Sequence, residues 1–280
     1  MTEFRSLLFQ QRRFFMCRLI GYLGNPIRLD ELLYKQEHSL YKQSYSPLEL
    51  KSGVVCADGV GIGWYNEGGK PFTYRNTIPM WNDPNLEELS NYVQSTCTVG
   101  YARLAGIGES LDISNCQPFR SGKLLFVHNG EISNFQQTLY RPIRESLSDS
   151  TYGLIKGMTD SEHIFALLVE MWQSSPDNTL FSALRATVQK LTELASKYDT
   201  SFSANIIVTD GQEIAAIRYA YRTQAPTLYW SCDALKHPDE IIVASERLSN
   251  QNWTAFGEQS MLFFQAHSLQ PTISLLDKFA

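Results

Sequence analysis

The chain has 280 residues, of which 43% are hydrophobic and 12% aromatic, so it can bury a substantial core and is not a disordered or fibrous protein. Its formal net charge is −5 and no run of Lys or Arg exceeds two residues, which excludes a surface built to follow nucleic-acid phosphates. No apolar run reaches the roughly 18–20 residues of a membrane-spanning helix, so we expect neither a nucleic-acid nor a membrane partner.

Residues 1–16 do not share the pattern of the rest of the chain. Arginines interrupt their apolar residues, whereas a secretory signal places its charges before an unbroken apolar segment. We interpret residues 1–16 as a leader, a propeptide or a mis-assigned start, and residues 17–280 as one domain. We favour Met16 as the start, because trimming it would leave Cys17 first; the alternative is that the segment stays attached.

The predicted elements form strands, then two consecutive helices, then strands again. Short turns such as Asp210-Gly211 favour antiparallel sheets, and two helices on one sheet with a second sheet behind give a layered α/β arrangement. Strands are predicted at 17–23, 59–65, 72–75, 97–103, 123–128, 203–209, 213–218, 227–230, 240–244 and 261–265, helices at 30–36, 84–93 and 178–197 and from 160 onward, and a loop at 42–50.

Two local motifs refine this pattern. The glycines of Gly59–Gly63 are spaced G-x-G-x-G, but no long amphipathic helix follows them. We therefore interpret them as strand glycines that another backbone passes closely, not as a dinucleotide fingerprint. Thr159-Asp160-Ser161-Glu162 fits a capping box, in which Thr159 caps the helix and Glu162 reaches back.

Cys17 is the first candidate catalytic residue. A cysteine directly behind a methionine can become residue one of a mature chain, with a thiol and a free α-amine on the same carbon. That pair is a nucleophile with its own base. The alternative is a buried strand cysteine.

The five cysteines are scattered and contain no C-x-x-C pair, which predicts neither a structural zinc site nor a disulfide framework. We expect a cytoplasmic protein without a metal or other cofactor. The cysteines are Cys17, Cys56, Cys97, Cys116 and Cys232.

Asn129 and Gly130 are candidates for an oxyanion hole, because an amide and the following glycine N–H can point at one spot. The alternative is a strand that ends in an Asn-Gly turn. His128, directly before them, is either a structural strand-end residue or a substrate-binding residue.

Arg103 and Asp160 suit an amino-acid substrate. Arginine can hold a carboxylate by two hydrogen bonds, and aspartate can hold an ammonium. Alternatively, Arg103 is a solvated strand end and Asp160 a favourable partner of the helix dipole.

In their order and spacing these motifs resemble the class II glutamine amidotransferases, a family of N-terminal-nucleophile hydrolases. The motifs are Met16–Gly21, Arg103, His128–Ile132 and Thr159–Glu162. Gly61–Tyr65 and Trp81–Leu86 resemble the stand-alone members of that family, such as the ergothioneine-biosynthesis γ-glutamyl amidohydrolases.

The resemblance implies a four-layer αββα sandwich of antiparallel sheets, an α+β fold. It also implies an amidohydrolase that cleaves the γ-glutamyl amide of glutamine or of a small γ-glutamyl conjugate. Cys17 would be the nucleophile, Asn129 and Gly130 the oxyanion hole, and Arg103 and Asp160 the clamp on the glutamyl carboxylate and ammonium.

The chain departs from the family at Tyr101 and Gly106, where members often have His or Thr. This departure concerns the acceptor side of the pocket more than the glutamyl clamp. Gly106–Asn115 and Ser148–Met158 are long enough to be lids.

Three alternatives stay open. The chain could be a glutaminase subunit that passes ammonia to a separate synthase partner, or a non-catalytic scaffold or regulatory subunit, which retention of residues 1–16 would favour. A papain-type Cys/His protease is the third, although an α-amine base makes a histidine unnecessary. Its candidate histidines are His38, His128, His163, His237 and His267.

Overall fold

Two antiparallel sheets form the centre of the computed structural model, which describes residues 17–49, 55–106, 110–175, 177, 179–235, 239–250, 252–266, 268 and 270–276. The segment 1–16, interpreted above as a leader, lies outside the described residues. No helix in the described part of the chain is long and apolar enough to cross a membrane.

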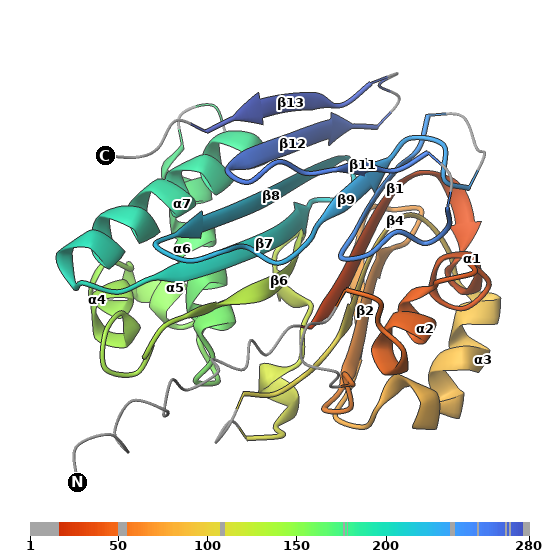
Figure 1. The fold of residues 1–280 in the computed structure, drawn as a ribbon, viewed down its shortest axis with the longest axis horizontal. Helices are drawn as coiled ribbons and strands as arrows, with labels where there is room; N and C mark the ends of the chain where they lie inside the picture. Colours follow the sequence, from red (N-terminus) through yellow and green to blue (C-terminus); the bar gives the residue numbers. More distant parts are fainter. Residues whose placement is uncertain are drawn as a thin grey trace, which may run out of the picture.

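The first sheet has seven strands in the order β11-β9-β10-β1-β4-β2-β3. Every pairing in it is antiparallel, and β1, which begins directly after Cys17, lies in its middle between β10 and β4 (Figure 1). Its strands are β1 Arg18–Arg28, β2 Val60–Tyr65, β3 Pro71–Asn76, β4 Gln94–Ala102, β9 Tyr229–Ser231, β10 Ile241–Ala244 and β11 Thr254–Ala255.

The second sheet has six strands in the order β13-β12-β8-β7-β6-β5 and is also antiparallel throughout. The predicted turn at Asp210-Gly211 joins β7 to β8, and Gly211 adopts a φ of 93°, which favours glycine. Its strands are β5 Phe119–Ser121, β6 Leu124–Ile132, β7 Phe202–Thr209, β8 Glu213–Tyr221, β12 Ser260–Gln265 and β13 Thr272–Leu275.

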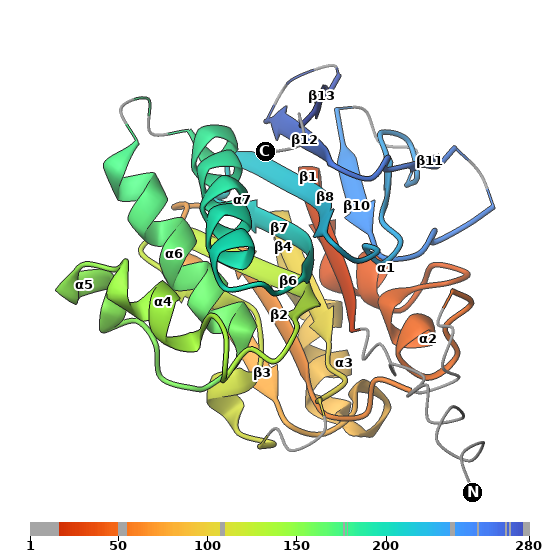
Figure 2. The same ribbon diagram turned by 60° about the vertical axis from the view of Figure 1, so that its left-hand side comes forward.

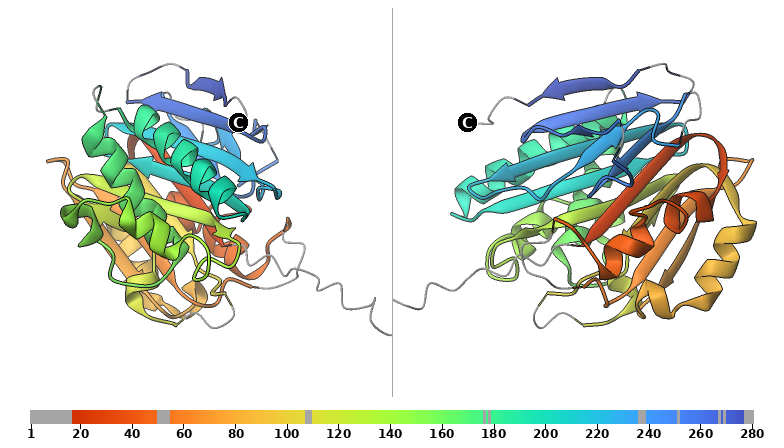
Figure 3. Two further views of the ribbon diagram at one scale, coloured as in Figure 1. Left: turned by 90° about the vertical axis from the view of Figure 1, so that its left-hand side faces the viewer. Right: turned by 45° about the vertical axis from the view of Figure 1, so that its right-hand side comes forward.

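Helices cover the outer face of each sheet, so the molecule has four layers, as predicted (Figure 2). Helices α1–α3 pack on the seven-stranded sheet, while α6 and α7 lie across the six-stranded sheet (Figure 3, left). The helices are α1 Leu29–Leu33, α2 Leu40–Tyr45, α3 Pro84–Tyr92, α4 Tyr140–Glu145, α5 Asp149–Tyr152, α6 Asp160–Ser174 and α7 Leu180–Lys197, with 3-10 turns at Met80–Asn82 and Ile113–Asn115.

The alternation of side chains along each strand separates two cores. On β6, Leu125 and Val127 pack between the sheets, whereas Phe126 packs under the helices. The same period places Asn129 on the face between the sheets. On β1, a Cβ at Gly21 would meet Ile207 of the opposite sheet, so that sheet approaches β1 closely.

Two predicted element boundaries were wrong. The stretch 42–50 was expected to be a loop, but its first part belongs to helix α2, whose N-cap Ser39 accepts a hydrogen bond from the Lys42 N–H. The strand predicted at 123–128 does not end at His128, and the alternative of a turn at Asn129-Gly130 does not hold. Strand β6 continues to Ile132 because β7 pairs with it along its whole length.

The glycines of β2 serve the role predicted for them. A Cβ on Gly61 would lie 1.7 Å from the carbonyl oxygen of Gln117, and one on Gly63 would lie 2.9 Å from Pro118 and Leu125 side-chain atoms. The segment that contains Gln117 therefore passes directly against β2, and the Gln117 side chain bonds to the backbone of His128 in β6.

We expect Gly61→Ala to lower the free energy of unfolding by about 3 kcal/mol, because backbone atoms rather than a flexible side chain would have to move. Urea unfolding monitored by circular dichroism measures this. Gly68→Ala is the matched control, since its Cβ would meet nothing closer than 3.5 Å. Equal unfolding midpoints for the two variants would contradict the close approach.

Candidate active site

The pairing of β1 with β4 places Cys17 beside two functional side chains. Arg18 pairs with Ala102 and Leu19 with Tyr101. Continuing this register by one residue puts Cys17 opposite Arg103. Because paired positions share a face of the sheet, Cys17, Tyr101 and Arg103 project in the same direction.

The Cys17 thiol lies among hydrogen-bonding groups. The Tyr101 hydroxyl donates to Sγ at 2.8 Å, and the Leu104 N–H donates to it at 3.3 Å. The thiol can also donate to the Leu104 carbonyl oxygen at 3.4 Å. Only 8% of Cys17 is exposed, and it opens onto the pocket described below.

A buried ion pair fixes the backbone of Cys17. The Arg18 guanidinium donates to the Cys17 carbonyl oxygen at 2.9 Å and lies 2.7 Å from a Glu246 carboxylate oxygen. The other oxygen of Glu246 bonds to Nε2 of His38 at 2.6 Å. Burial alone would raise the pKa of Glu246, but the hydrogen bond to His38, the charge of Arg18 and backbone N–H donors lower it to about 2.

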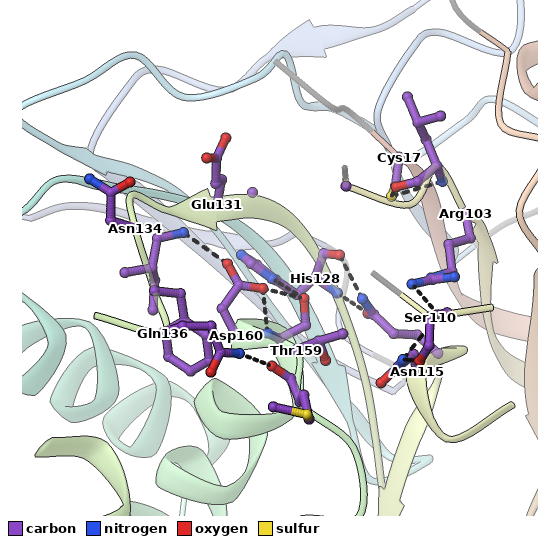
Figure 4. A pocket seen from close by; sticks show the side chains of 18 of the residues that line it. Cys17, Arg103, Ser110, Asn115, His128, Glu131, Asn134, Gln136, Thr159 and Asp160 are labelled. Atoms are coloured by element: carbon purple, nitrogen blue, oxygen red, sulfur yellow. Dashed lines mark hydrogen bonds between the residues drawn. The ribbon is translucent and has the colours of Figure 1, made fainter. Parts of the chain in front are cut away.

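A cavity of about 670 Å³ opens at Cys17. Five of the six sequence-predicted residues line it, namely Cys17, Arg103, His128, Gly130 and Asp160. Figure 4 shows Cys17 and Arg103 on one side of the pocket, with Asp160 across from them. The structure thus brings together residues that lie up to 143 positions apart in the sequence.

Asn129 is the sixth predicted residue and is not among those that line the cavity. It is 1% exposed, and among the described residues neither its amide nitrogen nor its amide oxygen has a hydrogen-bond partner. A buried amide without partners is costly and calls for an explanation such as a ligand group. Next to it, Gly130 has no room for a side chain, since a Cβ there would lie 2.0 Å from the Ser203 carbonyl oxygen.

Asp160 is held by the backbone at the start of α6. Its Oδ2 accepts the Ile132 N–H at 2.8 Å and its Oδ1 accepts the Ser161 N–H at 2.7 Å. Burial raises the pKa of Asp160, and these hydrogen bonds oppose the rise. The carboxylate therefore joins the end of β6 to the first turn of α6 in a fixed orientation.

Thr159 caps α6 as predicted, accepting the Glu162 N–H at 3.3 Å. The second half of the predicted capping box is wrong. Glu162 does not reach back to Thr159 but accepts the N–H groups of Lys156 and Gly157, at 2.8 and 2.6 Å. It thereby holds the end of the segment 148–158, which was predicted as a lid and supplies Met158 to the pocket wall.

Arg103 is 2% exposed, so its charge is buried at the pocket wall. Its guanidinium lies 3.4 Å from the carbonyl oxygens of both Asp58 and Ser110, which is long for a hydrogen bond. The first lid candidate supplies Ser110 and Asn115 to the pocket, while residues 107–109 lie outside the described residues.

His128 has a supporting role in the geometry. Its Nδ1 bonds to the Ser161 hydroxyl at 2.8 Å and its Nε2 lies 3.4 Å from the Ser203 carbonyl oxygen. Burial lowers the pKa of His128 to about 4, so the ring is neutral near pH 7. The Gln117 side chain pairs with both the N–H and the carbonyl of His128.

The described histidines give the Cys/His protease alternative no support. His38 bonds to Glu246, and His163 bonds to Thr159 and Arg144. The ring nitrogens of His128 bond to Ser161 and Ser203, not to Cys17. His237 and His267 lie outside the described residues.

Sequence reasoning missed Glu246 and Gln117. Glu246 pairs with Arg18 and Gln117 bonds to the backbone of His128, and no sequence motif around either residue predicts its partner. Tyr101 was noticed only as a departure from the family pattern. Its position beside Cys17 could have been predicted from the register between β1 and β4, but the sequence alone does not show that these two strands pair.

Comparison with known proteins shows which family this site belongs to. A family model described as "Glutamine amidotransferases class-II" matches residues 41–226, about two thirds of the chain. The chain belongs to the class-II glutamine amidotransferases. It is accordingly an enzyme of the group that acts on carbon–nitrogen amide bonds.

Two relatives match this amidotransferase over most of their own length. The probable glutamine amidotransferase DUG3 of Saccharomyces cerevisiae is 29% identical, over 91% of this chain and 83% of the relative. The γ-glutamyl-hercynylcysteine sulfoxide hydrolase of Mycolicibacterium smegmatis is 28% identical, over 82% of this chain and 87% of the relative.

A solved structure is similar to the amidotransferase in fold. The glutamine aminotransferase class-II domain protein from Silicibacter pomeroyi superimposes with a TM-score of 0.68 at 25% identity. The match covers 93% of this chain and all of the other. The sandwich is therefore the fold of the N-terminal-nucleophile amidotransferase domains.

We expect Glu246→Gln to lower the free energy of unfolding at neutral pH by about 3–5 kcal/mol, because Arg18 would stay buried without its counter-charge. The fall in the pKa of Glu246 from 4.5 to about 2 makes its stabilisation fully present above pH 4.5 and lost as the pH falls through 2. The difference between wild type and variant should therefore shrink in acid, which urea unfolding at about pH 7 and about pH 3 measures.

Glu258→Gln is the control, since Glu258 is 47% exposed and its nearest contact with Arg218 is 3.6 Å. We expect it to change the free energy of unfolding by less than about 1 kcal/mol at either pH. A Glu246→Gln penalty that is the same at both pH values would contradict the role of the ionised carboxylate.

Proposed function

We propose that this amidotransferase hydrolyses the γ-glutamyl amide bond of glutamine or of a small γ-glutamyl conjugate. The observation that carries the proposal is the placement of the Cys17 thiol in one pocket with Arg103 and Asp160. A nucleophile, a cation and an anion in one cavity match a scissile amide, a carboxylate and an ammonium on one small molecule. The name of the mycobacterial relative, a γ-glutamyl hydrolase, supports this substrate class.

Arg103 and Asp160 would hold the glutamyl end. The Arg103 guanidinium lies at the pocket wall and can donate two charge-assisted hydrogen bonds to a substrate carboxylate. The Asp160 carboxylate already accepts backbone N–H groups, and its remaining lone pairs can accept the substrate ammonium. The γ-carbonyl then extends toward Cys17.

The first half-reaction forms a thioester. The Cys17 thiol gives its proton to the α-amine, Sγ adds to the γ-carbonyl carbon, and the oxygen takes up the negative charge in the tetrahedral intermediate. The Asn129 amide and the Gly130 N–H donate to that oxygen. The C–N bond then breaks, and the departing amine takes its proton from the α-ammonium of Cys17.

The second half-reaction releases glutamate. Water attacks the thioester carbonyl and gives a proton to the α-amine, and the C–S bond breaks to return the Cys17 thiolate. An α-amine has a reference pKa of about 8, which suits proton transfer in both directions near neutral pH. This chemistry requires a free α-amine on Cys17, so residues 1–16 would have to be absent from the active protein.

All five cysteines are free, which supports the cytoplasm as the proposed compartment.

The principal alternative to a self-sufficient hydrolase is a glutaminase subunit that passes ammonia to a synthase partner. Activity of the purified chain alone distinguishes the two, because such a subunit would hydrolyse little without its partner.

We expect a chain that begins at Cys17 to release glutamate from γ-glutamyl amides, and Cys17→Ala to lower kcat by at least about 10³-fold. A chain that keeps residues 1–16 should be similarly inactive, because its α-amine is tied up in a peptide bond. Glutamate release, measured with a coupled dehydrogenase assay, tests both. Full activity of Cys17→Ala would contradict the nucleophile, and full activity of the longer chain would contradict the amine.

We expect Asn129→Ala to lower kcat by about 10²–10³-fold with little change in KM, because its amide would act only on the developing oxyanion. Asn205→Ala is the matched control. Asn205 pairs with Asn129 across β6 and β7 and is equally buried, but its amide donates to the Pro226 and Thr227 carbonyls. The control should lose stability and keep kcat; an equal loss of kcat in both variants would argue against the oxyanion hole.

A further inference from the structure

We propose that Tyr101 is an additional catalytic residue, whose phenol O–H donates a hydrogen bond to the Cys17 sulfur and favours its nucleophilic thiolate form. The inference rests on the proposed role of Cys17 as nucleophile. It adds an activating group that does not belong to the N-terminal residue itself.

The contact between the Tyr101 hydroxyl and the Cys17 sulfur follows from the strand register. Cys17 lies opposite Arg103 by continuation of the β1–β4 pairing, so Tyr101 is its diagonal neighbour on the same face. Such diagonal positions are about 7–8 Å apart at the backbone, a distance that an aromatic side chain spans. The hydroxyl reaches Sγ at 2.8 Å, and Tyr101 is 4% exposed.

Two donors converge on the sulfur. The Leu104 N–H lies 3.3 Å from Sγ, in addition to the Tyr101 hydroxyl. Hydrogen bonds to the charged form of a group favour that form, and they are stronger where water is excluded. The two donors thus stabilise negative charge on the attacking sulfur, as an oxyanion hole stabilises negative charge on an oxygen.

These donors change when the thiolate forms in the reaction. In an enzyme whose sulfur has no such donors, the N-terminal amine takes the thiol proton only as the sulfur attacks. Here the thiol proton passes to the α-amine before attack, and the phenol and the Leu104 N–H stabilise the thiolate that remains. The α-ammonium formed in this way then delivers its proton to the departing amine.

Other titratable groups also surround the nucleophile. Arg103 lies on the same face of the first sheet, and the Arg18–Glu246 pair lies behind Cys17. Cys56 lies close enough to interact electrostatically with Cys17, Arg18, Glu246 and Asp58. Asp160 and neutral His128 lie across the pocket. A Tyr101→Phe variant leaves all of them in place, so the change isolates the phenol.

The test is the pH dependence of Cys17 alkylation by iodoacetamide in the purified protein, mapped by peptide mass spectrometry. The other thiols interfere little, because burial raises the pKa of Cys97 to about 12 and that of Cys232 to about 11, and also raises those of Cys56 and Cys116. We expect Tyr101→Phe to move the alkylation midpoint up by about one pH unit and to lower kcat/KM at neutral pH about tenfold, mainly through kcat.

Tyr22→Phe is the matched control. Tyr22 is fully buried on β1, and its hydroxyl donates to the Asn25 carbonyl oxygen at 2.7 Å. We expect this variant to keep the wild-type alkylation midpoint. An unchanged midpoint in Tyr101→Phe, or an equal shift in Tyr22→Phe, overturns the proposal.

The two readouts separate this inference from the proposed function. A shifted midpoint in Tyr101→Phe supports the hydrogen bond even if no γ-glutamyl amide is hydrolysed, in which case the substrate class is wrong. Active wild-type protein with an unshifted Tyr101→Phe midpoint leaves the hydrolase proposal standing and removes Tyr101 from the mechanism.

Discussion

The antiparallel pairing of β1 with β4 is the constraint on which the site depends. It aligns the thiol of Cys17, the phenol of Tyr101 and the guanidinium of Arg103 on one face. A slip of β1 by one residue would turn Cys17 to the face opposite Tyr101 and Arg103. The register is held from behind by Arg18, whose side chain binds the Cys17 carbonyl and Glu246 in the fully buried interior.

The site contains a buried polar group that the described residues leave unsatisfied. The Asn129 amide has no hydrogen-bond partner among them. This arrangement costs stability in a buried position. A substrate that supplies a polarised carbonyl would complete it, which is the expected property of a donor oriented in advance of the reaction.

Local sequence signals predicted most of the elements because those signals act over a few residues. The alternation in 17–23, the cap at Thr159 and the turn at Asp210-Gly211 all depend on near neighbours. The failures came where distant contacts decided the outcome. The Asn-Gly pair in β6 has a strong turn preference, but pairing with β7 overrides it. Cys17 and Asp160 were assembled into one site only through family resemblance, since no local pattern brings them together.

The nucleophile and the proposed oxyanion donors come from different sheets. Cys17, Tyr101 and Arg103 belong to the seven-stranded sheet and its edges, whereas Asn129 and Gly130 lie on β6 of the other. Their separation is therefore set by the apolar side chains between the sheets, such as Leu19, Val127 and Ile207. Protein interiors are close-packed, so a change of one methylene group in this layer is felt by its neighbours. Reaction geometry should consequently respond to substitutions in this core even where no polar group is altered.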